Sequence, residues 1–235
     1  MATLFLIRHG QASYGETDYD RLSARGRDQA AALGRFLGGA RLTRLYAGPL
    51  VRQRQTAEVA AEAAAAAGLA LPDAQALPEL AEYPAFEMLK HLIPRLVAED
   101  ARFAALETAP TPRLLDEAFH AVLARWSRDE WAVPGLERVS GFVARVRGGL
   151  DRIFRGAGSG DRVACVTSAG PIGVAVGLAF GIAEDRMVKT SIVIRNASIT
   201  ELRFRSRDFD WRPDQLSLVT FNVTSHLTDE LHTER

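Results

Sequence analysis

Hydrophobic residues in the first third of the chain form short unbroken runs that alternate with longer stretches of helical spacing. Residues 3–7 (TLFLI) are a continuous apolar run, typical of a strand that is buried on both faces. Apolar residues in 23–37 recur at helical spacing, and Ser23 is a candidate N-cap. Residues 42–47 repeat the strand pattern, and 50–67 are rich in helix-forming alanine. This β-α-β-α order predicts an α/β fold with a largely parallel sheet.

The pattern changes over residues 83–135, where prolines interrupt apolar residues that mostly keep helical spacing. We expect short helices there that cover another part of the molecule, within one domain spanning 1–235. The pattern then predicts a helix at 136–155, a buried strand at 162–167, a helix at 171–180, and late strands at 191–205 and 216–222. The two late strands are expected to form a return pair at an edge of the sheet.

Length and composition are those of an ordinary globular protein. The 235 residues are 47% hydrophobic and 25% charged, which suffices for one large core. The 29 basic and 29 acidic side chains cancel, so we expect no basic face for nucleic acid. Cys165 is the only cysteine, which excludes an internal disulfide. Because we find no targeting segment and no stretch that could span a bilayer, we expect a soluble cytoplasmic protein with no membrane partner.

Cationic side chains follow the first two predicted strands. Arg8, His9 and Gly10 come directly after the first strand, at the end where open parallel sheets bind ligands. Arg52 falls in the first turn of the helix that follows the second strand. Free N–H groups and the positive end of the helix dipole lie there, and the arginine fork matches phosphate oxygens. The sequence therefore predicts a site for a tetrahedral oxyanion.

The motif LIRHG at residues 6–10 resembles the signature of the histidine phosphatase superfamily, in its phosphoglycerate-mutase-like branch. Further segments resemble later motifs of that family in the expected order: residues 22–30, 49–57, 80–82, 195–200 and 222–227. The resemblance covers nearly the whole chain, although residues 85–135 carry no motif. It implies a three-layer α/β/α sandwich around a mostly parallel central sheet, with a helical insertion at approximately 83–135 that covers the site.

The resemblance also implies a mechanism. His9 would attack phosphorus and become a phosphohistidine, while a hydrogen bond holds its other ring nitrogen. Arg8 and Arg52 would neutralise the phosphoryl oxygens, so that neither a metal nor a cofactor is required. Glu82 is the first candidate and Glu79 the second for the acid that protonates the leaving oxygen, and its pKa should be raised by burial. Water would then attack the phosphohistidine.

Six residues are the candidates for binding the phosphorylated substrate: Arg8, Gly10, Gln11, Arg52, Ser168 and Ala169. Gly10 is expected to permit an unusual backbone conformation beside His9. Ser168 stands where the family usually has a second histidine. Losing one such donor typically costs ~3–4 kcal/mol of transition-state stabilisation, so we expect weakened activity or altered specificity. His226, for which we favour a structural role, is the remaining candidate for a replacement cation.

Three functions are compatible with these residues. The leading hypothesis is a metal-independent phosphomonoester hydrolase that acts on a small phosphorylated molecule through His9. The alternatives are a phosphate-ligand-binding module with weakened catalysis, motivated by Ser168, and a phosphomutase. The large apolar residues of 85–135 either line a pocket or form the core of the insertion, and we favour the core. Neither the substrate nor the oligomeric state follows from the sequence.

Overall fold

A computed structural model of the chain describes residues 1–13, 19–206, 208–212 and 214–233. A six-stranded sheet forms its centre, in the order β3-β2-β4-β1-β5-β6. The strands are β1 (Ala2–Arg8), β2 (Arg44–Ala47), β3 (Ala74–Ala76), β4 (Arg162–Thr167), β5 (Ile199–Phe204) and β6 (Leu216–Val223). The first four are mutually parallel, whereas β5 runs antiparallel to β1 and β6 antiparallel to β5. The mostly parallel sheet and the return pair at its edge are thus confirmed.

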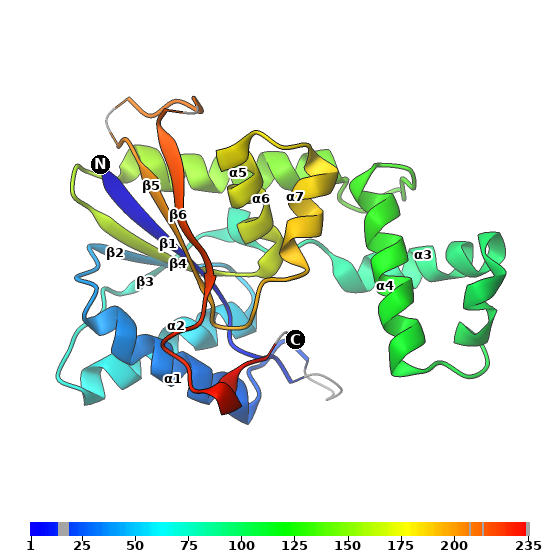
Figure 1. The fold of residues 1–235 in the computed structure, drawn as a ribbon, viewed down its shortest axis with the longest axis horizontal. Coiled ribbons are helices and arrows are strands. Elements are labelled where there is room, and N and C mark those ends of the chain that lie inside the picture. The colour runs from blue at the N-terminus through cyan, green and yellow to red at the C-terminus, as the bar shows by residue number, and fades with distance from the viewer. Residues whose placement is uncertain (14–18, 207, 213, 234–235) are drawn as a thin grey trace.

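Helices cover both faces of this sheet (Figure 1). On one face lie α1 (Ala24–Gly38) and α2 (Val51–Ala66), and on the other lie α5 (Val139–Gly156), α6 (Ala169–Phe180) and α7 (Glu184–Ser191). Ser23 caps α1, because its side chain accepts a hydrogen bond from the Gly26 amide. The three-layer α/β/α sandwich is confirmed.

The apolar run of β1 is explained by its place between two cores. Leu4 and Leu6 belong to the large core, which extends beneath α5, α6 and α7. Phe5 and Ile7 point to the opposite face and belong to a smaller core beneath α1 and α2. Since successive side chains of a strand alternate between faces, a strand with helices on both sides must be apolar at every position.

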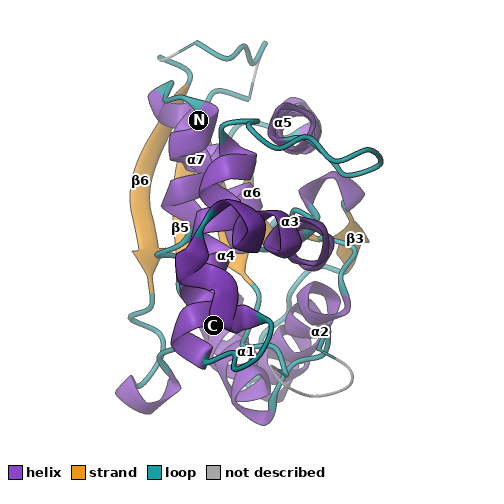
Figure 2. Cartoon of the chain, turned by 90° about the vertical axis from the view of Figure 1, so that its right-hand side faces the viewer, coloured by secondary structure: helices purple, strands orange, loops and turns teal. Residues whose placement is uncertain are grey.

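Two helices and a 3₁₀ segment stand to one side of the sandwich, and we call them the cap helices: α3 (Ala85–Glu99), η2 (Ala101–Leu106) and α4 (Pro112–Ser127). Viewed from that side, α3 and α4 lie in front of the sheet (Figure 2). Met88, Phe103 and Trp126 are buried among them, so these large side chains form a core. Phe86 and Leu115 are exposed, at 60% and 41%, and the Phe86 ring lies edge-on to Tyr19 at 4.8 Å.

Several local predictions differ from the structure. The strand predicted for 191–205 begins only at Ile199, because α7 ends at Ser191 and turns fill the interval. Ile192 and Val193 suggested a buried strand but are 40% and 59% exposed. The sequence pattern also missed α7, which is only eight residues long, and β3, whose three residues are all exposed. Two further short 3₁₀ helices lie at Pro78–Leu80 and Asp229–Leu231. No helix in the described ranges is long and apolar enough to cross a bilayer.

Candidate active site

The ends of neighbouring parallel strands and the start of α2 meet at the candidate active site. In the sheet register Arg8, the last residue of β1, pairs with Thr167, the last residue of β4. His9 and Ser168 therefore leave the sheet side by side at its carboxyl edge. Arg52 is the second residue of α2, which follows β2 at the same edge. Strand order thus brings together residues that lie far apart in the sequence.

The His9 ring is buried and hydrogen-bonded at both nitrogens. Its Nδ1 lies 2.7 Å from the carbonyl oxygen of Gly10, and Arg52 Nε lies 3.0 Å from its Nε2. Because the carbonyl can only accept and Arg52 can only donate, Nδ1 carries the proton and the lone pair is on Nε2. Burial, followed by the charges of Arg52 and Arg8, holds the His9 pKa well below its usual value. The ring is therefore neutral, as a nucleophile requires.

The backbone of His9 is fixed on both sides. Its amide donates to the Thr167 carbonyl at 2.9 Å, across the β1–β4 edge. Its carbonyl accepts from the Ala197 amide at 3.2 Å and from Asn196 Nδ2 at 3.3 Å. Ala197 adopts φ 54°, a left-handed conformation that turns the chain towards His9 just before β5. Residues 196 and 197 therefore fix the position of the His9 backbone.

Arg52 is held by an acidic residue that the sequence analysis did not identify. Asp20 Oδ1 accepts from Arg52 Nη1 at 2.6 Å, and Asp20 Oδ2 accepts from the Val51 amide at 2.8 Å. One carboxylate thus binds both the guanidinium and the free N–H at the start of α2. The Tyr19 ring lies beneath the same guanidinium at 5.7 Å. These contacts orient Nε of Arg52 towards His9.

Arg8 supplies a second guanidinium at the same site. Its Nη1 donates to the carbonyl of Ile194, which anchors the side chain to the segment before β5. Desolvation lowers the pKa of Arg8, an effect that the nearby Glu82 carboxylate opposes. The positive charge of Arg8 helps to lower the pKa of His9 and opposes the rise in the pKa of Glu82.

Glu82 reaches this site from the segment that precedes the cap helices. Its two carboxylate oxygens accept from the Gly170 amide at 3.1 and 3.2 Å, at the start of α6. The Tyr83 amide adds a hydrogen bond at 3.1 Å. Burial raises the pKa of Glu82 above its usual value, although these amides and the charges of Arg52 and Arg8 oppose the shift. A raised pKa suits a group that must donate a proton.

Glu79 lies elsewhere. Its carboxylate pairs with Arg152 of α5 at 2.6 Å, where the Arg152 side chain is more than half exposed. Hydrogen bonds to its own amide and to Arg152 lower its pKa, although burial opposes this. Of the two acid candidates, the structure brings only Glu82 to the edge of the sheet where His9 lies.

A sequence profile of the histidine phosphatase superfamily (branch 1) matches this chain over residues 4–128 and 99–213. The chain belongs to that superfamily. Among curated proteins, none matches this chain.

Solved structures resemble this chain over almost its full length. The protein YhfR of Bacillus stearothermophilus has a TM-score of 0.68 at 18% identity, with 96% of this chain and 99% of that chain covered. A mycobacterial glucosyl-3-phosphoglycerate phosphatase, solved with inorganic phosphate, has a TM-score of 0.64 at 20% identity, with 96% and 99% covered. A mutant phosphoserine phosphatase of Entamoeba histolytica, solved with phosphoserine, has a TM-score of 0.57 at 20% identity, with 97% and 100% covered. At such identities the likeness shows a shared fold.

In this chain Gly10 is required for close packing, and the predicted unusual backbone conformation is wrong. Its φ lies outside the left-handed region, but a Cβ there would come within 2.4 Å of the Gly26 carbonyl oxygen. The Gly10 amide donates to Thr56 Oγ1 at 3.0 Å. The neighbouring Gln11 points its amide oxygen to Ser23 Oγ at 3.0 Å, at the start of α1.

Ser168 is fully buried, and its hydroxyl is engaged by a neighbour. Gln53 Nε2 donates to Ser168 Oγ at 2.8 Å, while Gln53 Oε1 accepts from the Leu50 amide at 3.0 Å. A Cβ at Gly48, where the family often has serine, would lie 2.2 Å from that same Gln53 oxygen. The residues at 48 and 168 are thus linked through Gln53. Ala169 begins α6 beside them.

His226 is not the replacement cation. Its ring stacks on Phe36 of α1 at 5.5 Å, and burial lowers its pKa to about 4, so it is neutral near pH 7. It lies next to Leu227, which packs in a small cluster between α1 and the C-terminal turn. The structural role that we favoured for this histidine agrees with its position.

Three side chains around the site escaped the sequence analysis, namely Asp20, Gln53 and Thr56. Asp20 lies thirty-one residues before the amide it binds, and no local pattern indicates such a pairing. Thr56 could have been found, because it lies one helical turn after Arg52, whereas Gln53, the residue directly after Arg52, has no such spacing. Both are fully buried polar residues. Within the described part of the chain, no three His, Cys, Asp or Glu side chains group as a metal site.

Proposed function

We propose that this protein hydrolyses phosphomonoesters through a phosphohistidine on Nε2 of His9. The observation that carries the proposal is the state of that ring: Nδ1 is bound to the Gly10 carbonyl, and Nε2 faces the Arg52 guanidinium. A neutral imidazole with its lone pair directed at a cation is suited to attack an anion held by that cation. The names of the similar structures, which include two phosphatases, support the same reaction class.

The reaction begins when the phosphoryl group enters between His9 and Arg52. The Arg52 Nε–His9 hydrogen bond must break, and the guanidinium then binds phosphoryl oxygens with Arg8. Nε2 forms a bond to phosphorus, the bond from phosphorus to the leaving oxygen breaks, and Glu82 gives that oxygen its proton. Arg8 and Arg52 supply the positive charge, so the proposed reaction needs no metal ion.

Hydrolysis of the phosphohistidine completes the cycle. A water molecule attacks phosphorus as the Glu82 carboxylate, now ionised, takes its proton, and the bond between phosphorus and Nε2 breaks. Inorganic phosphate leaves, while His9 returns to the neutral ring and Glu82 to the acid. The raised pKa of Glu82 supports this exchange, because burial favours the protonated form that the first step requires.

A second candidate function is a phosphate-binding module without effective turnover. It is favoured by Ser168, whose hydroxyl already accepts a hydrogen bond from Gln53 and brings no positive charge to the site. In that case phosphate would bind saturably against Arg52, and no phosphohistidine would form.

The test is hydrolysis of p-nitrophenyl phosphate in the presence of a chelator, followed by detection of the intermediate. We expect phosphate release with the chelator present and, after rapid quenching at high pH, a phosphoryl group on His9 by mass spectrometry. His9→Ala should abolish both, whereas the matched control His120→Ala, at an exposed histidine of α4, should leave both unchanged. Equal rates for His9→Ala and the wild type would refute the proposal. Saturable phosphate binding without turnover would select the binding module.

A further inference from the structure

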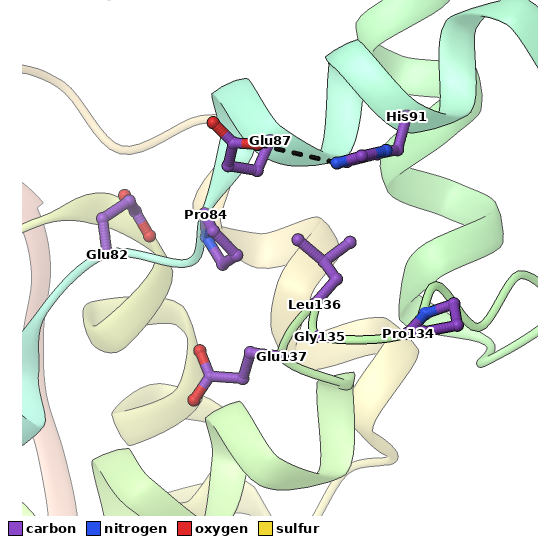
Figure 3. A pocket seen from close by; sticks show the side chains of 8 residues that line it. All are labelled: Glu82, Pro84, Glu87, His91, Pro134, Gly135, Leu136 and Glu137. Carbon is purple, nitrogen blue, oxygen red and sulfur yellow. Dashed lines mark ion pairs between the residues drawn. The ribbon is translucent and has the colours of Figure 1, made fainter.

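A cavity of about 390 Å³ opens between the start of α3 and the segment that leads into α5. Figure 3 shows Glu87 and His91 of α3 on one side and residues 134–137 on the other. Glu82 and Pro84 close one end. The volume is within the range of pockets that hold small organic ligands.

Glu82 belongs both to this cavity and to the candidate active site. Its carboxylate binds the Gly170 amide and is acted on by Arg8 and Arg52, yet the same side chain lines the cavity. In the proposed reaction Glu82 protonates the leaving oxygen. The group attached to that oxygen therefore begins at Glu82, and the cavity that starts there can receive it.

The walls of the cavity are rich in carboxyl groups. Three of its eight lining residues are glutamates, one is histidine, and none is lysine or arginine. Arg145 holds Glu137 through two hydrogen bonds of 2.8 Å and also donates to the Ala81 carbonyl, which fixes this wall next to Glu82. Glu87 lies on the opposite wall, with one oxygen 3.6 Å from His91 Nε2.

We propose that this cavity binds the leaving group of the phosphoester and selects amino-alcohol phosphates over phosphates that carry a second anionic group. An ammonium group would lie between Glu87 and Glu137, whereas a carboxylate or second phosphate would face like charges without a cation in the lining. Pro84 and Leu136, which line the cavity, pack against the carbon chain between the phosphoryl group and the ammonium group. This inference rests on the proposed function, because it uses Glu82 as the acid.

The test compares three phosphoesters that each carry four carbons: 4-aminobutyl phosphate, n-butyl phosphate and 4-(phosphonooxy)butanoate. We expect kcat/KM to fall in that order, with about tenfold between the first and the last. Glu87→Gln should reduce this ratio about threefold. Glu117→Gln is the matched control, since Glu117 is an exposed glutamate of α4 that pairs with Arg113 outside the cavity, and the ratio should not change.

The outcomes separate the two proposals. Equal kcat/KM for the three esters, or fastest turnover of the carboxylate, overturns the selectivity while phosphatase activity stands. An unchanged ratio in Glu87→Gln overturns the assignment of this cavity. No hydrolysis of any ester, together with none of p-nitrophenyl phosphate, removes the proposed function and the inference with it.

Discussion

Asp20 offers a sensitive test of how the site is assembled. Its carboxylate joins Arg52 to the first amide of α2, and Arg52 in turn donates to His9 Nε2. Asp20→Ala removes both bonds and leaves the Arg52 guanidinium without its carboxylate. We therefore expect a loss of orientation at Arg52 without a change in the residues that perform chemistry.

The size of the effect follows from the geometry. A hydrogen bond between charged groups contributes ~1.5–3 kcal/mol when buried. The Arg52 side chain is 11% exposed but that of Asp20 is 32% exposed, so solvent screening reduces this to about 1–2 kcal/mol. The expected loss in kcat/KM is about 5–30-fold. The loss should appear in kcat, while KM and the inhibition constant of inorganic phosphate stay constant or fall, because removing a carboxylate increases the positive potential.

The assay is steady-state hydrolysis of p-nitrophenyl phosphate, with inorganic phosphate as a competitive inhibitor. Thr111→Ala is the matched control, since Thr111 Oγ1 caps α4 at the Leu114 amide and lies among the cap helices. Both variants lose a helix cap worth ~1 kcal/mol of stability, but only Asp20→Ala should lose kcat. If kcat of Asp20→Ala stays within twofold of the wild type, Asp20 does not position Arg52.

Three further changes test other contacts. Gly10→Ala should lower stability by about 1–3 kcal/mol and activity by more than tenfold, because its Cβ would lie 2.4 Å from the Gly26 carbonyl oxygen. The control is Gly148→Ala, whose Cβ would meet nothing within 4 Å. Equal thermal unfolding of the two variants would contradict the packing argument. Glu82→Gln should slow the hydrolysis of alkyl phosphates by ~10²–10⁴ but that of p-nitrophenyl phosphate far less, since the p-nitrophenolate leaving group needs no acid. It should also abolish the decline in kcat/KM for alkyl phosphates as pH rises through the raised Glu82 pKa. Equal losses on both esters would exclude Glu82 as the acid. The pKa of His226 is about 4 in the folded protein, below its value in the unfolded chain. Its neutral form therefore contributes stability above about pH 6.5, and this contribution is lost as pH falls. Between pH 7.5 and pH 5, denaturant unfolding should show the wild type losing about 2 kcal/mol more free energy of unfolding than His226→Gln, and the opposite sign would refute the assignment.

The sequence predicts the part of this site that depends on strand order. A continuous apolar run must be a strand between two helical layers, and parallel strands present their carboxyl ends at one edge. His9 follows one such strand, and Arg52 lies in the first turn of the helix after another, so the approach of Arg52 Nε to within 3.0 Å of His9 Nε2 is a consequence of topology. Hydrophobic periodicity is enough to identify such elements.

Contacts that depend on side-chain packing across the fold could not be predicted. Asp20 meets Arg52 only because the loop after β1 returns to the start of α2. The misassigned strand at 191–198 has the same cause, since the β-branched residues Ile192 and Val193 are exposed in a turn. Local residue preference is weak evidence where tertiary contacts decide the backbone.

The residues around Ser168 are closely packed. Gln53 occupies the space above Gly48 and binds Ser168, so these three positions form one packed unit. A histidine at 168 would be larger than serine and would have to displace Gln53 or enter the space beside His9. The positive charge at the site therefore comes from Arg8 and Arg52, and Asp20 already offsets part of the latter. With so few cations, transition-state stabilisation depends on the orientation of the two guanidiniums more than on their number.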